Sequence, residues 1–128
     1  GHSDADVLIH SICDALLGAA NLGDIGKHFP DTDPKYKGID SKLLLKEVMV
    51  LIRKKGYEIG NIDSTICLQT PKIKLYIPEM QKVIAACMRV DTDLVSIKAT
   101  TTEKLSFVGR EEGVSAYATV LINKILKS

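Results

Sequence analysis

The sequence has no tryptophan and only two phenylalanines, so any buried core must be built mainly from aliphatic side chains. It contains no apolar run near the roughly 20 residues that cross a bilayer, and Asp4 and Asp6 interrupt the apolar stretch that a signal peptide would need here. The formal net charge is only +1, with no marked excess of either sign. These features argue against a nucleic-acid partner and against a membrane partner.

The cysteines are few and do not form a recognisable metal or redox motif. Cys13, Cys67 and Cys87 are an odd set without a C-x-x-C pair, which is typical of reduced core thiols in a cytoplasmic protein. With 128 residues, 45% of them apolar, the chain can build the core of one ordinary domain without a disulfide or a metal. The sequence has no initiating methionine and opens on a helix cap, so we expect residues 1–128 to form a single domain that is N-terminally incomplete.

The spacing of apolar residues switches between helical and strand periods along the chain. Helical spacing predicts helices over residues 4–21 with Gly23 as the cap, from Asp40 or Ser41 to residue 55, and onward from residue 77 with Pro78 in the first turn. Alternation at every second residue predicts strands over 58–69, 95–101 and 114–122, and turn formers predict loops over 24–34 and 102–113. The chain is therefore predicted to be an α+β domain, a small mixed sheet with helices on one face, whose other face is covered by further copies of the chain.

The first predicted helix carries a polar stripe. Ser3 and Asp6 have the spacing of a capping box at its start. Asp6, His10 and Asp14 recur at every fourth position and therefore share one side of the helix. Two interpretations of His10 remain open, namely a partly buried, hydrogen-bonded imidazole or a metal ligand that an adjacent aspartate orients.

Residues 99–104, with the sequence ATTTEK, end a predicted strand and enter a loop that contains glycine. Hydroxyl groups and backbone amides donate to phosphate oxygens, Glu103 suits a hard divalent cation, and Lys104 adds positive charge. Phe107 and Arg110 would add an aromatic face and a guanidinium for phosphate. The alternative is a threonine-rich strand end followed by an ordinary solvated loop.

Two further segments have the composition of ligand-binding loops. Residues 69–74, just past a strand, combine backbone groups with lysines, although two exposed lysines would look the same. Residues 29–33 offer acceptors for the hydroxyls of a polyol, although aspartates that cap two turns would also explain them. His28 has no partner nearby in the sequence and is predicted to be exposed. The sequence contains no P-loop, no G-x-G-x-x-G and no nucleophile elbow.

Taken in order, the motifs resemble one enzyme family over essentially the whole chain, the 2-C-methyl-D-erythritol 2,4-cyclodiphosphate synthases of non-mevalonate isoprenoid biosynthesis. The motifs are HSDADVxxH at 2–10, DALLGAA at 14–20, DIGKxFPDTDP at 24–34, the segment from Lys37-Gly38 to Gly56-Tyr57, QTPK at 69–72, the helix start at Ile77-Pro78, KATTTEK at 98–104 and FxGRxEG at 107–113.

The resemblance implies a ferredoxin-like domain in a chorismate-mutase-like homotrimer, with each site between two subunits. It implies a phosphorus–oxygen lyase that acts on a small-molecule cytidine diphosphate substrate, 4-diphosphocytidyl-2-C-methyl-D-erythritol 2-phosphate. The product would be 2-C-methyl-D-erythritol 2,4-cyclodiphosphate, with release of CMP. The implied cofactors are zinc, or another divalent transition metal, and a magnesium or manganese ion.

The resemblance also implies roles for individual residues. His10 would bind zinc, Glu103 would bind magnesium or manganese, and His2 and Thr101 would stabilise the transition state. The methylerythritol phosphate part would contact His2, Ser3, Asp24, Ile25, Gly26, Phe29, Pro30, Asp31, Thr32 and Asp33. The cytidine pocket would consist of Leu68, Gln69, Thr70, Pro71, Lys72, Ile73 and Lys74. The cytidine diphosphate would contact Thr100, Thr101, Thr102 and Glu103, and Phe107 and Arg110 would complete the site.

One departure from the family pattern concerns the zinc ligands. The family takes two of them from a D-x-H pair on a strand that precedes the HSD segment, and this sequence begins after that point. A catalytic zinc ion usually has three protein ligands, so we expect one strand and two ligands to be missing from the sequence. The alternative is a non-catalytic trimeric module that binds a nucleotide or a metal.

Overall fold

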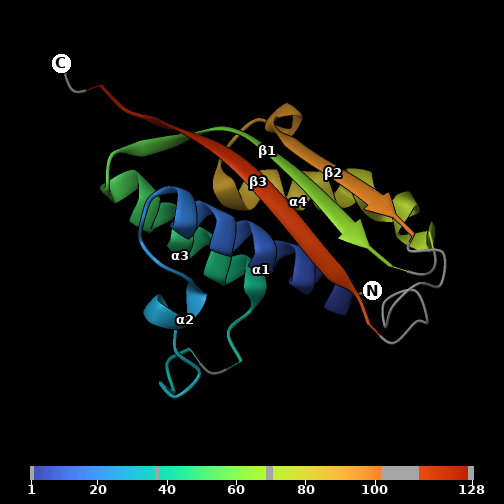
Figure 1. The fold of residues 1–128 in the computed structure, drawn as a ribbon, viewed down its shortest axis with the longest axis horizontal. Helices are drawn as coiled ribbons and strands as arrows, with labels where there is room; N and C mark the ends of the chain where they lie inside the picture. The colour runs from blue at the N-terminus through green and yellow to red at the C-terminus, as the bar shows by residue number, and fades with distance from the viewer. Residues whose placement is uncertain (1, 37, 69–70, 102–112, 127–128) are drawn as a thin grey trace.

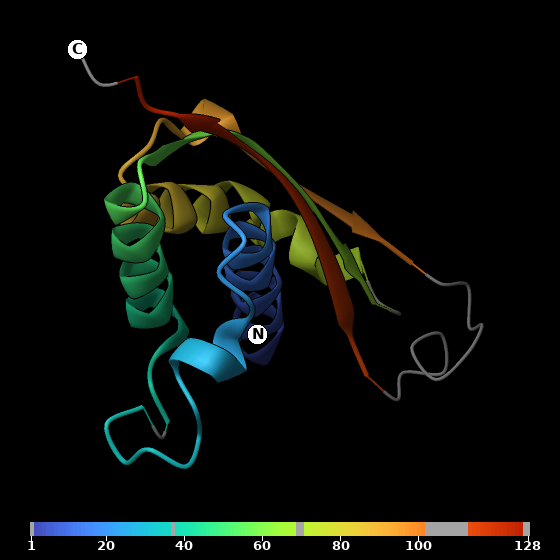
Figure 2. The same ribbon diagram turned by 60° about the vertical axis from the view of Figure 1, so that its left-hand side comes forward.

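The computed structural model describes residues 2–36, 38–68, 71–101 and 113–126. It contains three long helices and a three-stranded sheet among these residues (Figure 1). The helices of the described residues all lie on the same side of the sheet, as the turned view in Figure 2 makes plain. The α+β prediction, with a small mixed sheet covered by helices on one face, is confirmed.

Helix α1 spans His2–Ala19 and is the central helix of the core. Leu8, Ile12 and Leu16 are fully buried because they recur at intervals of four residues on one side of it. The helix begins at His2, so Ser3 lies within its first turn rather than at the predicted cap. It ends two residues before Asn21, which has φ 56°, and the Leu22 amide donates to the Leu17 carbonyl at 2.8 Å. Asn21 therefore terminates the helix in place of the predicted Gly23.

Residues 24–34 were predicted as one long loop, and this prediction is wrong in part. The short helix α2, Ile25–His28, lies within them. Asp24 caps it, because its side chain accepts from the Lys27 amide at 3.0 Å. Four residues are too few to produce a recognisable apolar period, so the sequence pattern gave no sign of this helix.

Helix α3, Ser41–Lys54, has Asp40 as its N-cap, which accepts from the Lys42 amide at 2.8 Å. Its buried face contains the apolar side chains Leu44, Leu45, Val48, Met49 and Ile52. After β1 the chain forms the 3₁₀ helix η1, Pro71–Tyr76, which continues directly into helix α4, Ile77–Met88. Pro78 lies in the first turn of α4, as predicted. A short turn η2, Thr92–Leu94, leads into the second strand.

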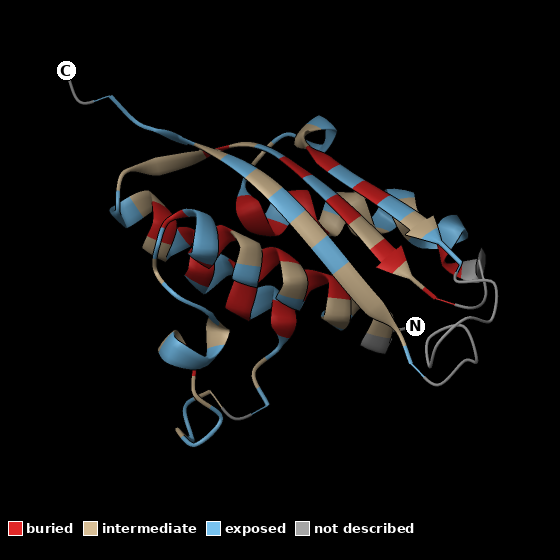
Figure 3. Cartoon of the chain, in the orientation of Figure 1, coloured by how far each residue is buried: buried red, intermediate tan, exposed pale blue. Residues whose placement is uncertain are grey.

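The sheet has the order β2-β1-β3, with β1 at Tyr57–Cys67, β2 at Val95–Thr100 and β3 at Ser115–Lys124. The central strand β1 is parallel to β2 and antiparallel to β3, and its Ile62 lies opposite both Val95 and Val120. Figure 3 shows buried residues at alternate positions along β1 and β2, whereas partly buried and exposed residues alternate along β3. The outer face carries exposed Tyr117 and Leu121.

No helix within the described ranges is long and apolar enough to cross a membrane.

Candidate functional site

The carboxyl ends of the parallel strands β1 and β2 lie side by side. The Leu68 amide, one residue beyond β1, donates to the Thr100 carbonyl at the end of β2 at 3.0 Å. Thr100 and Thr101 are exposed at this edge. Ligands of open α/β sheets commonly bind beyond the carboxyl ends of strands, so two predicted site segments meet where a ligand has access.

Segment η1 packs against the same edge of the sheet. Ile73 is buried with Ile66 and Leu68 in a small apolar cluster, while Lys74 is exposed. We call Leu68, Ile73, Lys74, Thr100 and Thr101 the strand-end region. Gln69, Thr70, Thr102, Glu103, Phe107 and Arg110 lie outside the described residues, and so do the side chains of His2, Ser3, Pro71 and Lys72.

The predicted methylerythritol phosphate residues gather around α2, and we call Asp24–Asp33 the α2 region. Phe29 is buried and its ring meets the Tyr36 ring edge-on, with 5.2 Å between the centroids. Asp24, Gly26, Asp31 and Thr32 are exposed. Phe29 thus anchors this segment to the core, because its burial fixes the backbone, and the polar groups on either side face solvent.

His28 lies in the α2 region, and its predicted exposure is wrong. The side chain is partly buried, and Nε2 donates to the Leu22 carbonyl at 2.5 Å. Its ring centroid lies 6.2 Å from that of Phe29. Because its partner is a backbone carbonyl six residues earlier, brought close by the bend between α1 and α2, sequence spacing did not indicate it.

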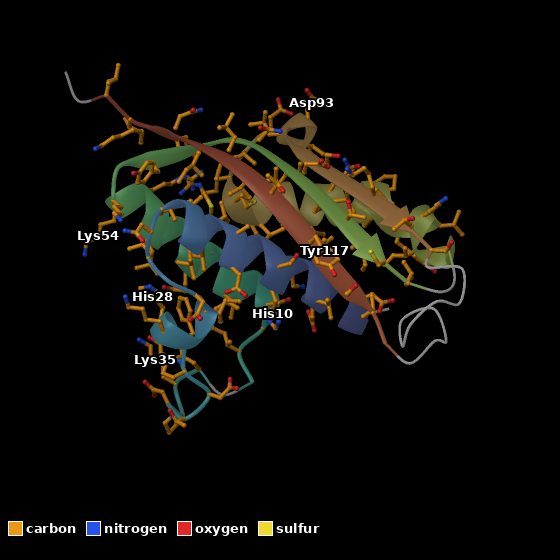
Figure 4. All side chains as sticks on the ribbon, viewed as in Figure 1. His10, His28, Lys35, Lys54, Asp93 and Tyr117 are labelled. Atoms are coloured by element: carbon orange, nitrogen blue, oxygen red, sulfur yellow. The ribbon has the colours of Figure 1, made fainter. Side chains whose placement is uncertain are left out.

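His10 is exposed on α1, so the interpretation as a partly buried imidazole is wrong (Figure 4). The aspartates on either side hold neighbouring segments. Asp6 accepts from the Ser41 hydroxyl at 2.6 Å, and Asp14 accepts from the Ile25 amide at 2.9 Å. One of the two interpretations of His10 paired it with an adjacent aspartate, and the sequence pattern could not indicate the true partners because they are 35 and 11 residues away in the chain.

The donor chemistry of His10 suits zinc, since an accessible neutral imidazole is a good zinc ligand. The residues described by the structure nevertheless contain no group of three or more His, Cys, Asp or Glu side chains that could hold a metal ion. A complete three-ligand site is therefore not assembled from them. His10 fits the metal only as one member of a larger set.

A pocket of about 470 Å³ opens between the N-terminal parts of α1 and α3 and the segment formed by η1 and α4. Its walls are mainly apolar, with Ile9, Ile73 and Ile84 among them, and the hydrogen-bonded pair Asp6–Ser41 adds polar groups. Ile73 also belongs to the strand-end region. No sequence pattern indicated this pocket, because its walls come from three segments that are separate in the chain.

Two of the three thiols are buried in the core. Cys13 and Cys87 are buried and Cys67 is partly buried, and all three are free. Burial raises the pKa of the Cys13 thiol to about 12, so this thiol stays protonated at neutral pH. Burial also raises the pKa of Cys87. The prediction of reduced core thiols is consistent with Cys13 and Cys87, whereas Cys67 is only half-buried.

Within one chain the two predicted parts of the site are far apart in both ribbon views. The α2 region projects from the helical layer, away from the sheet. The strand-end region lies on the other side of the molecule, where β1 and β2 end (Figures 1 and 2). A ligand that contacts both regions therefore requires a second chain or residues beyond those described.

The fold and these two regions define a small α+β domain whose polar loops lie at the ends of parallel strands and beside a short capped helix. The YgbB family model matches residues 1–123, and the chain belongs to this family. It is similar to two proteins named 2-C-methyl-D-erythritol 2,4-cyclodiphosphate synthase. The one from Bacteroides fragilis is 68% identical over 125 residues, which is 98% of this chain and 79% of that protein. The one from Phocaeicola vulgatus is 69% identical over 124 residues, which is 97% of this chain and 78% of that protein.

Solved structures agree with this family assignment. The chain is similar to IspF of Plasmodium falciparum in a CDP complex, with a TM-score of 0.83 and 34% identity over 98% of this chain and 76% of that one. It is also similar to the bifunctional IspDF of Campylobacter jejuni, with a TM-score of 0.88 and 45% identity over 93% of this chain and 32% of that longer one. The family resemblance predicted from the motifs is confirmed.

Proposed function

We propose that this chain is a phosphorus–oxygen lyase of the non-mevalonate isoprenoid pathway. It converts 4-diphosphocytidyl-2-C-methyl-D-erythritol 2-phosphate into 2-C-methyl-D-erythritol 2,4-cyclodiphosphate and CMP. The observation that carries the proposal is the near-complete match to synthases of this name at 68–69% identity. The CDP complex of the similar Plasmodium falciparum protein supports a cytidine diphosphate ligand.

The reaction needs no nucleophile from the protein. An oxygen of the substrate's 2-phosphate attacks the β-phosphorus of the same molecule, and the bond from that phosphorus to the CMP oxygen breaks. Two anionic groups must approach each other, so the protein's task is to align them and to offset their charge. Near-attack positioning contributes roughly 7–11 kcal/mol in favourable cases.

Each region of the chain has its own part in this proposal. The strand-end region, with Gln69 to Lys72 and Thr102, Glu103, Phe107 and Arg110, holds the cytidine diphosphate. The α2 region, with His2 and Ser3, holds the methylerythritol phosphate part. His2 and Thr101 donate to the oxygens on which charge develops. The exposure of Thr100 and Thr101 beside Leu68 supports the first assignment, because it leaves hydroxyls open to phosphate oxygens.

Metal ions and a trimer belong to the proposal. His10 would contribute to a zinc site, completed by ligands outside the described residues, and Glu103 would hold magnesium or manganese. When bound, such cations neutralise phosphate charge and orient the reacting groups. The separation of the α2 region from the strand-end region supports a homotrimer in which two subunits share each site.

The test is to follow CMP and cyclodiphosphate by phosphorus NMR in the presence of magnesium. We expect turnover by the wild-type protein and a loss of roughly 100-fold or more in Glu103→Gln, because a neutral amide is a poor ligand for a hard cation. Glu47→Gln, a change at an exposed position on α3, is the matched control and should keep wild-type turnover. Undiminished turnover in Glu103→Gln would remove that residue from the metal site. Nucleotide binding without any CMP release by the wild type would favour the non-catalytic module.

A further inference from the structure

The first backbone amide of α2 is held by a side chain from another helix. The first N–H groups of any helix have no partner within it and need an outside acceptor. In α2, the Lys27 amide is satisfied by Asp24, whereas the Ile25 amide donates to Asp14 Oδ1 at 2.9 Å. Asp14 lies on α1, which spans 18 residues and is packed along its length into the core. The short helix is therefore tied to the longest one at its starting residue.

Helix α2 depends on such ties, because four residues are far too few to be helical alone. Its apolar anchors lie at its edges, with Ile25 partly buried against the core and Phe29 buried after its last turn. Asp24 and Gly26, by contrast, are exposed and have no packing to fix their position. The hydrogen bond from the Ile25 amide to Asp14 holds the backbone between Asp24 and Gly26, and it therefore restricts the positions of both residues.

We infer that Asp14 is a positioning residue for the α2 region and sets the place of Asp24, Ile25 and Gly26 against the ligand. The inference rests on the proposed function, which assigns these three residues to the methylerythritol phosphate part. Asp14 itself contacts no ligand in this account. Its effect is transmitted through the Ile25 amide, so the property that matters is an acceptor oxygen at position 14 rather than a negative charge.

Position 14 also lies one helical turn after His10, which would allow a different role. A carboxylate there would add negative charge beside the proposed zinc ligand. The two roles are separable by chemistry. An asparagine at position 14 keeps an acceptor oxygen at the same distance along the side chain but removes the charge, whereas an alanine removes both.

The experiment compares Asp14→Ala and Asp14→Asn in the full chain. In Asp14→Ala we expect the Ile25 amide to exchange with deuterium three- to tenfold faster and KM to rise three- to tenfold, as for the loss of one hydrogen bond. kcat should change less than KM, and CDP affinity should stay unchanged because the strand-end region is remote. Asp14→Asn should bring exchange and KM back to near wild-type values, and both variants should keep the wild-type zinc content.

The matched control is Asp91→Ala. Asp91 also accepts from a backbone amide, that of Asp93 at 3.0 Å, but it caps η2 before β2 rather than α2. This variant should leave KM and Ile25 exchange unchanged, which separates the specific effect from a general loss of a capping bond.

Two results would overturn the inference. One is wild-type KM and wild-type Ile25 exchange in Asp14→Ala. The other is an Asp14→Asn protein as impaired as Asp14→Ala with reduced zinc content, which would assign the residue to the metal through its charge. If the wild type releases no CMP, the proposed function fails, and Ile25 exchange alone then decides whether Asp14 anchors α2.

Discussion

Arg53 links three segments of the chain through one guanidinium group. Its Nε and Nη2 donate to the Glu58 carboxylate at 3.1 and 3.0 Å, and Nη2 also donates to the Met88 carbonyl at 2.6 Å. The end of α3, the start of β1 and the end of α4 are thereby joined. The hydrogen bonds from Arg53 lower the pKa of Glu58 below its ordinary value of 4.5, because they favour the ionised carboxylate.

This lowered pKa predicts a loss of stability in acid. Because the folded-state pKa of Glu58 lies below the unfolded value, its contribution is complete above about pH 4.5 and disappears as pH falls through the folded value. The carboxylate is 44% exposed, so we expect only about 0.3–1 kcal/mol. Urea unfolding at pH 6 and pH 3 should show that the wild type loses this much more stability than Glu58→Gln. An identical loss in both proteins would contradict the prediction.

At the level of secondary structure, the central strand β1 shows how backbone contact constrains a residue. The pairing of β1 with β3 shifts register between Ile59 and Asn61. A Cβ on Gly60 would lie 3.0 Å from the backbone oxygen of Leu121 and from its side chain. Leu121 belongs to the neighbouring strand β3, so its backbone cannot move away without disturbing the ladder.

Gly60→Ala is therefore expected to destabilise the protein by about 1–3 kcal/mol, as overpacking does. Gly18→Ala is the matched control, since the added methyl group on α1 would meet no atom within 4 Å. This control should raise stability by about 0.5–1 kcal/mol, because alanine loses less backbone entropy than glycine in a helix. Chemical denaturation measures both changes. A Gly60→Ala protein as stable as the wild type would show that the strands at this register shift move apart without a loss of stability.

The long elements were predictable from the sequence because each repeats one period over ten or more residues. The buried residues of α3 and the alternation of Ile62, Ser64 and Ile66 in β1 are of this kind. Helix α2 was not predicted, since short elements depend on caps and tertiary contacts rather than on a period. The contacts that organise the candidate site, such as Asp14 with Ile25, join residues whose proximity depends on how the chain bends. Sequence motifs predicted which residues form the site, but no local pattern predicted how these residues are arranged in space.

For the whole molecule, the uncovered face of the sheet is the main surface to be explained. Tyr117 is 67% exposed and Leu121 is 56% exposed on the face opposite the helices. In the proposed homotrimer this face packs against other subunits, which would remove both side chains from water. The same assembly would bring the α2 region of one subunit near the strand-end region of another.

We therefore expect a particle mass three times the 14.0 kDa of one chain in sedimentation velocity. Leu121→Asp should weaken this assembly by at least tenfold, because a carboxylate would be buried at the interface without a partner. Val50→Asp is the matched control, since Val50 is 60% exposed on α3, away from the sheet face, and should leave the mass unchanged. A wild-type protein that sediments as a monomer at all concentrations would rule out the shared site.

Helix α1, near the beginning of the chain, packs against β3, near its end. This pairing has a consequence for synthesis on the ribosome. The apolar face of α1 emerges from the ribosome before α3 and β3, and its contacts with β3 form only after that strand has been translated. Non-local pairing of this kind slows folding, so we expect nascent chains that stop before β3 to expose α1 and to bind chaperones.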